Sequence, residues 1–200
     1  MKKNLFVFVA GSGTGKTTLL KKLCEENNFE KLITTTTRNP RVEENEINGV
    51  HYFFITKDEF LKKEENGEMI EKNEFNGNLY GLSKGALLNV TSGKTPAVIL
   101  EAEGAKSAKE KLSKDWNVYA IYIDENLETR ISRTLKRGDS GDDIKSRLSL
   151  MKNQEEKWKN MLTYDLTTPQ GQSIDELVKI VVDFSTQKEA CSNRSKIKPR

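Results

Sequence analysis

A glycine-rich segment near the N-terminus has the residue types and spacing that bind phosphate. Three glycines precede Lys16 and Thr17, and the segment directly follows the apolar run Leu5–Ala10. Glycines let backbone N–H groups turn toward a phosphate, the lysine reaches the β- and γ-phosphate oxygens, and the hydroxyl after it can hold Mg²⁺. Ala10 stands where the usual motif begins with glycine, but the strand before the motif and the amphipathic helix after it supply the required context. The sequence therefore predicts a nucleoside triphosphate site formed by Gly11, Ser12, Gly13, Thr14, Gly15, Lys16, Thr17 and Thr18.

A second group of phosphate-binding residue types follows that helix. Arg38 and Arg41 stand three residues apart beside the threonine run 34–37. Arginine binds phosphate oxygens through two parallel N–H groups, so the pair suits a phosphate monoester, while a surface turn is the alternative. The hydroxyls of Tyr52 and Tyr80 can donate to the same phosphate, although each tyrosine taken alone also fits a packed sheet position. The sequence thus predicts a second phosphate site.

A third group of cations lies in the helical stretch after Asn126. Arg130, Arg133 and Arg137 share one face at helical spacing, and Arg147 belongs to the next helix. Arginines that converge on a transferring phosphoryl group stabilise the charge of its transition state. An exposed basic helix face is the alternative, and it fits Arg130 better than Arg137.

Taken in order, these segments resemble the guanylate kinase family over about residues 4–184. The triphosphate motif is the specific signal, and the others gain weight from their order and spacing. Besides that motif, the resemblance rests on Thr36–Arg41, His51–Phe54, Ile70–Glu71, Gly77–Gly81, Arg137–Gly138 and Arg147–Leu148.

The resemblance implies an enzyme that transfers a phosphoryl group from ATP, with Mg²⁺, to GMP or dGMP. The residues that it implies for catalysis are Lys16, Arg38, Arg41, Arg133, Arg137 and Arg147. Those implied for GMP are Thr34, Arg38, Arg41, Tyr52, Glu71, Tyr80 and Glu103. Glu71 would accept hydrogen bonds from guanine N1–H and the 2-amino group, which adenine does not present. Thr17 and Glu101 would hold the metal.

These sites need a parallel α/β sheet with helices on both faces. Continuous apolar runs at Leu5–Ala10, Ala97–Leu100 and Val118–Ile123 are typical of strands covered on both sides. The expected division is a core of residues 1–32, 84–125 and 149–184, a β-rich monophosphate-binding insertion at 33–83, a helical lid at 126–148, and a disordered basic tail at 185–200. Two capping boxes, at Thr56–Glu59 and Ser173–Glu176, predict helix starts.

Composition excludes several other classes of protein. Formal net charge is +3, but residues 185–200 alone carry +4, so the predicted folded part has no basic excess for nucleic acid. No apolar run approaches the roughly 18 residues of a membrane span. Cys24, Cys191 and His51 are too few for a disulfide framework or a Cys/His metal site. We expect a cytoplasmic protein whose partners are nucleotides, with the choice between monomer and homodimer open.

Two departures from the family pattern keep alternatives open. Leu82 stands where the family has a hydroxyl residue for guanine O6, which favours a kinase with a different or broader monophosphate acceptor. The segment Tyr164–Pro169 lacks the asparagine expected near the donor base. A non-catalytic protein-binding module of the same family is the third reading, but Lys16 and Thr17 argue against it because such a module has no use for a phosphate lysine.

Overall fold

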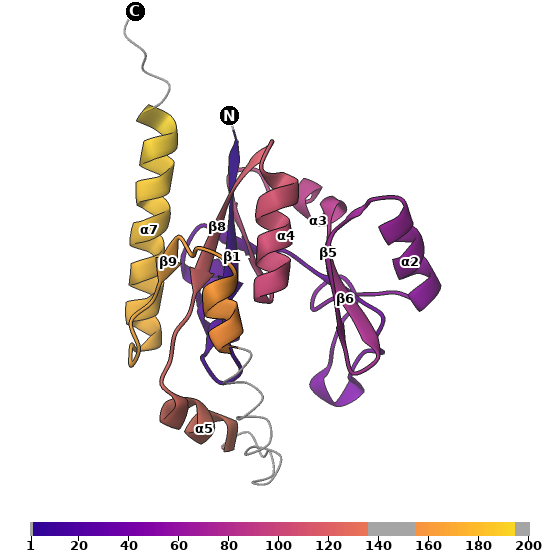
Figure 1. The fold of residues 1–200 in the computed structure, drawn as a ribbon, viewed down its shortest axis with the longest axis horizontal. Coiled ribbons are helices and arrows are strands. Elements are labelled where there is room, and N and C mark those ends of the chain that lie inside the picture. The colour runs from indigo at the N-terminus through magenta and orange to yellow at the C-terminus, as the bar shows by residue number, and fades with distance from the viewer. Residues whose placement is uncertain (1, 136–154, 195–200) are drawn as a thin grey trace, which may run out of the picture.

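The computed structural model describes residues 2–135 and 155–194, and these form two β-sheets with helices packed around them (Figure 1). The larger sheet is parallel throughout, with the strand order β2-β7-β1-β8-β9. Its strands are β1 (Lys3–Val9), β2 (Phe29–Lys31), β7 (Thr95–Ile99), β8 (Trp116–Tyr122) and β9 (Leu166–Thr167). The predicted parallel α/β core is confirmed.

Strand β1 is buried on both faces, which explains its unbroken apolar sequence. Leu5, Val7 and Val9 pack toward α4 (Ala102–Leu112) and the helix formed by residues 155–161. The alternate residues Phe6 and Phe8 pack toward α1 (Lys16–Glu26) and α7 (Ile174–Arg194). Because successive side chains of a strand point to opposite faces, one strand supplies both halves of the core. The triphosphate motif follows directly at the carboxyl end of this strand.

The segment expected to be β-rich forms the smaller sheet, with the strand order β4-β3-β6-β5. Its strands are β3 (Thr35–Thr36), β4 (Phe53–Phe54), β5 (Met69–Phe75) and β6 (Asn78–Ser83). Helix α2 (Lys57–Glu65) covers it through Phe60, which packs with Met69 and Leu79. The short elements are a 3₁₀ turn, η1 (Val42–Glu44), and the helix α3 (Lys84–Leu88). This sheet meets the core at α4, where the Ser107 hydroxyl donates to the carbonyl of Ile70 at 2.9 Å.

Both predicted capping boxes are present. Thr56 caps α2, because its hydroxyl accepts the Glu59 N–H while the Glu59 carboxylate accepts the Thr56 N–H at 2.7 Å. Ser173 and Glu176 make the same reciprocal pair at the start of α7. These contacts also lower the pKa of Glu59 and that of Glu176, since backbone N–H donors favour the ionised carboxylate.

The prediction of a disordered tail from residue 185 is wrong for its first ten residues, because α7 continues to Arg194. No glycine or proline interrupts residues 174–194, and Ser185 is buried. The Lys188 ammonium lies 4.9 Å from the ring centroid of Phe184 and 5.4 Å from that of Tyr119. Polar residues thus extend the helix by packing along aromatic rings. Residues 195–200 lie outside the described part.

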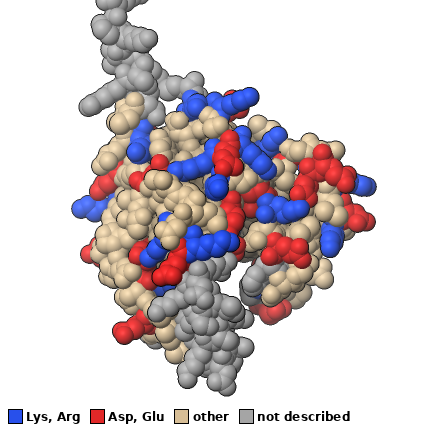
Figure 2. Space-filling view, viewed as in Figure 1, with Lys and Arg blue, Asp and Glu red and all other residues tan. Residues whose placement is uncertain are grey.

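The surface and the remaining helix complete the description. Helix α5 (Leu127–Leu135) is the described part of the predicted lid, and residues 136–148 of that prediction lie outside the described residues. In the view of Figure 2, acidic and basic side chains alternate over the described surface. Within the described ranges, no helix has the length and apolar character needed to cross a membrane.

Candidate active site

The glycine-rich segment forms a tight loop between β1 and α1. Gly13 and Gly15 have positive φ angles of 79° and 90°, and Gly15 is the N-cap of α1. A Cβ at Gly13 would lie 2.8 Å from the carbonyl oxygen of Arg130, so glycine is needed for space as well as for conformation. The Lys16 ammonium and the Thr14 hydroxyl both donate to the Gly11 carbonyl at 3.0 Å. Thr17 and Thr18 are exposed in the first turn of α1. The loop, the lysine and the helix N-terminus therefore have the arrangement of a phosphate-binding loop.

Arg130 is buried against this loop and supports it, so it does not lie on an exposed basic face. Its Nε donates to the Ser12 carbonyl at 2.9 Å. Its guanidinium forms an ion pair with Glu155 at 2.6 Å. Only 4% of Arg130 is exposed. Sequence reasoning missed this role, since its two partners lie far away in the chain. The alternative of a solvated cation is wrong for this residue.

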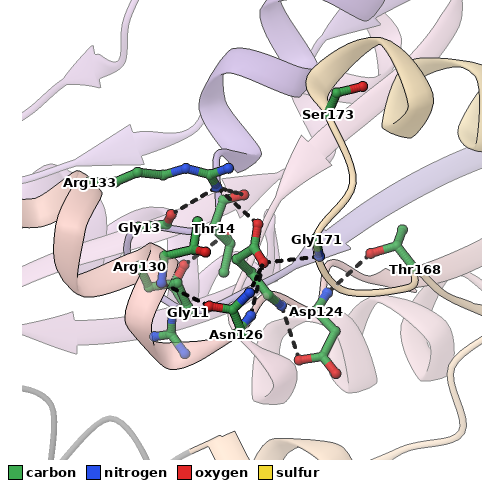
Figure 3. A network of polar contacts seen from close by, with 12 residues as sticks. Gly11, Gly13, Thr14, Asp124, Asn126, Arg130, Arg133, Thr168, Gly171 and Ser173 are labelled. Atoms are coloured by element: carbon green, nitrogen blue, oxygen red, sulfur yellow. Dashed lines mark hydrogen bonds and ion pairs between the residues drawn. The ribbon is translucent and has the colours of Figure 1, made fainter.

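Arg133 lies on the outer side of the same loop. Its Nη1 is 3.2 Å from the Glu125 carboxylate and 3.3 Å from the Thr14 carbonyl (Figure 3). Together with Gln172 it borders a cavity of about 320 Å³, whose lining residues are Thr14, Gly15, Thr18, Arg133, Gln172, Ile174 and Leu177. This cavity adjoins the predicted triphosphate site. Arg137 and Arg147 lie outside the described residues.

A second cavity, of about 400 Å³, contains none of the predicted site residues. It opens beside Lys2, Lys94 and Trp116. Lys2 and Trp116 lie at the amino-terminal ends of strands, whereas the phosphate-binding loop follows the carboxyl end of β1. Ligands of open parallel sheets bind at the carboxyl ends of the strands, so the smaller cavity is the candidate site.

On the smaller sheet, Arg38 lies against two aromatic rings. Its guanidinium carbon is 5.4 Å from the ring centroid of Tyr52 and 5.7 Å from that of Phe54. A contact with the side chain of Tyr80 adds to this environment. The structure thus brings together three of the residues predicted for the second phosphate. Arg41 lies on the exposed turn that follows, and Thr34 immediately precedes β3.

Glu46 is a residue of this site that sequence reasoning missed. Its carboxylate binds the Arg38 guanidinium through two hydrogen bonds of 2.7 and 2.8 Å and accepts the Arg41 backbone N–H at 2.8 Å. The hydrogen bonds from Arg38 lower the pKa of Glu46 to about 2 and raise that of Arg38. An acid near two arginines was the available signal, but Glu43 and Glu44 lie closer to Arg41 in the sequence.

Glu71 is a buried carboxyl group, with 7% of the residue exposed. One oxygen accepts the Leu82 backbone N–H at 2.7 Å. The other faces α4, where a Cβ on Gly104 would lie 3.0 Å away. Burial, opposed by the Leu82 hydrogen bond and reinforced by the charge of Glu101, raises the pKa of Glu71 to about 7.

Of the two carboxylates at the start of α4, the structure places Glu101 inside the site. Burial and the charge of Glu103 raise the pKa of Glu101, while a hydrogen bond with Asn73 and the positive charge of Lys16 oppose that rise. Glu103 has a half-exposed side chain and pairs with Lys157 at 3.4 Å. The charge of Glu101 thus acts on Glu71, and that of Lys16 acts on Glu101. Because Glu101 is also less exposed than Glu103, it is the better candidate for contact with a ligand. The described residues contain no cluster of three His, Cys, Asp or Glu side chains that could hold a metal ion.

Leu82 has a role that sequence reasoning did not assign to it. Its side chain is fully buried in the core with Ile70 and Leu87, so it does not face a ligand. Its backbone N–H instead holds the Glu71 carboxylate. Ser83, the next residue, caps α3 by accepting the Ala86 N–H at 3.4 Å.

The fold and the loop define a P-loop protein of the α/β class. The family model described as guanylate kinase matches residues 2–188. A guanylate kinase of Mycoplasmopsis pulmonis is 37% identical over 191 residues, covering 90% of this chain and 95% of that protein. A guanylate kinase of Bartonella henselae is 31% identical over 189 residues, covering 94% and 84%. This chain belongs to the guanylate kinase family.

The fold has a counterpart among solved structures. The crystal structure of guanylate kinase from Anaplasma phagocytophilum matches it with a TM-score of 0.67 at 23% identity, covering 94% of this chain and 86% of that one. At this identity the match concerns the fold alone.

Proposed function

We propose that this protein is an ATP:GMP phosphotransferase, which converts GMP or dGMP and ATP into GDP or dGDP and ADP. One observation carries the proposal: a phosphate-binding loop and a separate arginine–tyrosine cluster, with a buried carboxyl group near the second, occur in one chain. An oxygen of the GMP phosphate attacks the γ-phosphorus of ATP. The bond from that phosphorus to the β–γ bridging oxygen breaks, and ADP leaves.

The donor binds at the loop between β1 and α1. The loop N–H groups and Lys16 hold its phosphates, and the cavity beside Arg133 receives its nucleoside part. Thr17 and Glu101 fit Mg²⁺, because this ion takes one or two protein oxygens and completes its shell with phosphate oxygens and water. When bound, Mg²⁺ neutralises charge on the β- and γ-phosphates.

The acceptor binds between the smaller sheet and α4. Arg38, Arg41, Tyr52 and Tyr80 donate to its phosphate. Glu46 accepts one hydrogen bond from each Nη group of Arg38 and fixes the guanidinium plane against Tyr52. Such preorganisation places the attacking oxygen, and positioning is the largest part of this chemistry. Arg133, with Arg137 and Arg147, supplies charge for the transition state.

Glu71 selects guanine. Its ionised carboxylate accepts N1–H and the 2-amino group, and these two donors favour the charged form that burial disfavours. Adenine has neither donor, so a buried carboxylate facing it would remain unpaired. Residue 82 is a leucine whose side chain lies in the core, so it supplies no hydroxyl to the base. Discrimination between guanine and adenine therefore rests mainly on Glu71.

A kinase with a broader acceptor range is the second candidate, favoured by that missing hydroxyl. The deciding assay presents GMP, dGMP, IMP and AMP, each with MgATP, and measures ADP release. We expect GMP and dGMP to be good acceptors, IMP intermediate and AMP about ten- to hundredfold poorer in kcat/KM. Lys16→Ala is the control for contaminating activity and should be inactive. Equal use of AMP and GMP would contradict the guanylate assignment, and no turnover with any acceptor would favour a binding module.

A further inference from the structure

Glu125, the third residue after β8, contacts three residues through its carboxylate: Asn126, Arg133 and Gly171. Only 4% of its side chain is exposed. Oε1 accepts the backbone N–H groups of Asn126 at 2.9 Å and Gly171 at 3.1 Å, and also the Asn126 side-chain amide at 3.2 Å. Oε2 pairs with Nη1 of Arg133 at 3.2 Å. Both oxygens of the carboxylate are thus engaged, Oε1 by three donors and Oε2 by the guanidinium.

One partner of Glu125, Arg133 on α5, lines the cavity next to the phosphate-binding loop. Another partner, Gly171, immediately precedes the lining residue Gln172, which leads into α7. Glu125 itself is not among the lining residues. Its two oxygens join the two segments, so its position affects how Arg133 and Gln172 lie relative to each other.

The position of the Arg133 side chain depends on its ion pair with Glu125. Its side chain is 41% exposed, and a long cation at such a position has many rotamers in the absence of a partner. Its contacts with the carbonyls of Gly13 and Thr14, at 3.4 and 3.3 Å, are long for hydrogen bonds. The carboxylate of Glu125 is the charged group that holds the guanidinium over the loop. Asn126 strengthens the arrangement, since its side chain accepts the Thr129 N–H at 2.8 Å and caps α5.

We infer that Glu125 is a positioning residue for the donor nucleotide. It acts through Arg133 and the Gly171 amide, and it fixes the donor cavity before ATP arrives. Ordering these groups in advance lowers the entropy lost on binding, so the effect falls on donor affinity. The residues proposed for the acceptor phosphate and base lie on or next to the smaller sheet, whereas Glu125 follows β8 of the larger sheet. The inference rests on the proposed function only in assigning the cavity to ATP.

The test compares Glu125→Gln with Glu128→Gln. The first variant keeps an oxygen for Asn126 and Gly171 but loses the charge that holds Arg133. The second variant removes an equal charge at Glu128, an exposed residue in the first turn of α5, the helix that carries Arg133. Calorimetry with MgATP measures donor affinity directly, and steady-state kinetics give the KM for each substrate. For Glu125→Gln we expect ATP affinity to fall about three- to tenfold with the KM for GMP within twofold, and for Glu128→Gln no change.

A double-mutant cycle shows whether the effect passes through Arg133. In an Arg133→Ala background, adding Glu125→Gln should weaken ATP binding by less than twofold. An undiminished loss in that background, or wild-type ATP affinity in folded Glu125→Gln, would overturn the inference. If Glu125→Gln does not fold, Arg133→Gln removes the other end of the pair, and wild-type ATP affinity there would overturn it equally. ATP binding without GMP turnover would refute only the acceptor assignment.

Discussion

Replacing Glu71 by glutamine is expected to stabilise the folded protein at neutral and alkaline pH while impairing its use of GMP. In the folded state the pKa of Glu71 rises from the ordinary 4.5 to about 7, mainly because the carboxyl group is buried. The unfolded chain therefore loses this proton at lower pH than the folded chain does. Above pH 7 both states are ionised, and the folded state carries a buried charge. Glutamine keeps an oxygen for the Leu82 N–H and never ionises.

The size and sign of the effect follow from the two pKa values. Below pH 4.5 both states hold the proton, and the penalty vanishes. As pH rises from 4.5 to 7 the folded state binds more protons than the unfolded state, so stability falls, and the full penalty of about 3 kcal/mol is reached above pH 7. Integrating the linkage gives about 1 kcal/mol at pH 5 and about 3 kcal/mol at pH 8. The advantage of Glu71→Gln over wild type should thus grow by about 2–3 kcal/mol over this interval, or roughly 5–10 °C in Tm for a domain of this size.

Urea unfolding of both proteins at pH 5 and pH 8 measures this difference. Glu74→Gln is the matched control, because Glu74 is an exposed residue of the same strand, and its stability difference should not change with pH. The reasoning would be refuted if the advantage of Glu71→Gln were the same at both pH values, or larger at pH 5. In kinetic assays, the ratio of kcat/KM for GMP to kcat/KM for AMP should be smaller in the variant than in wild type. A change that stabilises the fold by removing a buried functional charge is expected to impair function in this way.

Two further predictions concern contacts far from the acceptor. Arg130→Ala leaves the carboxylate of Glu155 without its cation and should lower the free energy of unfolding, measured in urea, by about 3–5 kcal/mol. Arg130→Lys should recover part of this loss. A loss below about 1 kcal/mol in Arg130→Ala would mean that Arg130 does not stabilise the loop. Truncation after Phe184 removes the buried Ser185 and also Lys188, which packs on the aromatic rings, and should cost about 1–2 kcal/mol. Truncation after Arg194 should cost nothing measurable by thermal unfolding. Equal Tm values for the two truncations would contradict the packing of α7.

The features that could be predicted from the sequence are those set by short-range rules. The phosphate-binding loop depends on glycines at fixed offsets and on a strand and helix that directly adjoin it. The parallel sheet follows from unbroken apolar runs, and the helix starts at Thr56 and Ser173 follow from reciprocal caps three residues apart. In each case the residues that decide the structure lie within a few positions of one another, so the pattern is visible in the chain.

The features that were missed depend on partners that are remote in the sequence. Arg130 binds the carbonyl of Ser12, 118 positions away, and that contact turns an apparent surface cation into a buried brace. The last helix continues past Phe184, where Lys188 packs on the ring of Tyr119 in β8. This contact joins residues that are far apart in the sequence, so no local pattern predicts it. Glu46 could not be chosen over its acidic neighbours until the turn after Arg41 had placed it beside Arg38.

Glu71 shows most clearly why the arrangement of the site could not be predicted from the sequence. Strict alternation along β5 would put Ile70 and Glu71 on opposite faces, leaving Glu71 with Met69 on the side of Phe60. A bulge between Met69 and Glu71 shifts the register against β6 and opposes Glu71 to Leu82. Two successive residues then face α4: Ile70 packs with Ala105, and Glu71 lies beside Gly104. Bulges often re-aim a side chain next to an active site, and nothing in the sequence near Ile70 announces one. The same irregularity therefore lets Ile70 pack in the core and places the carboxyl group of Glu71 against the first turn of α4.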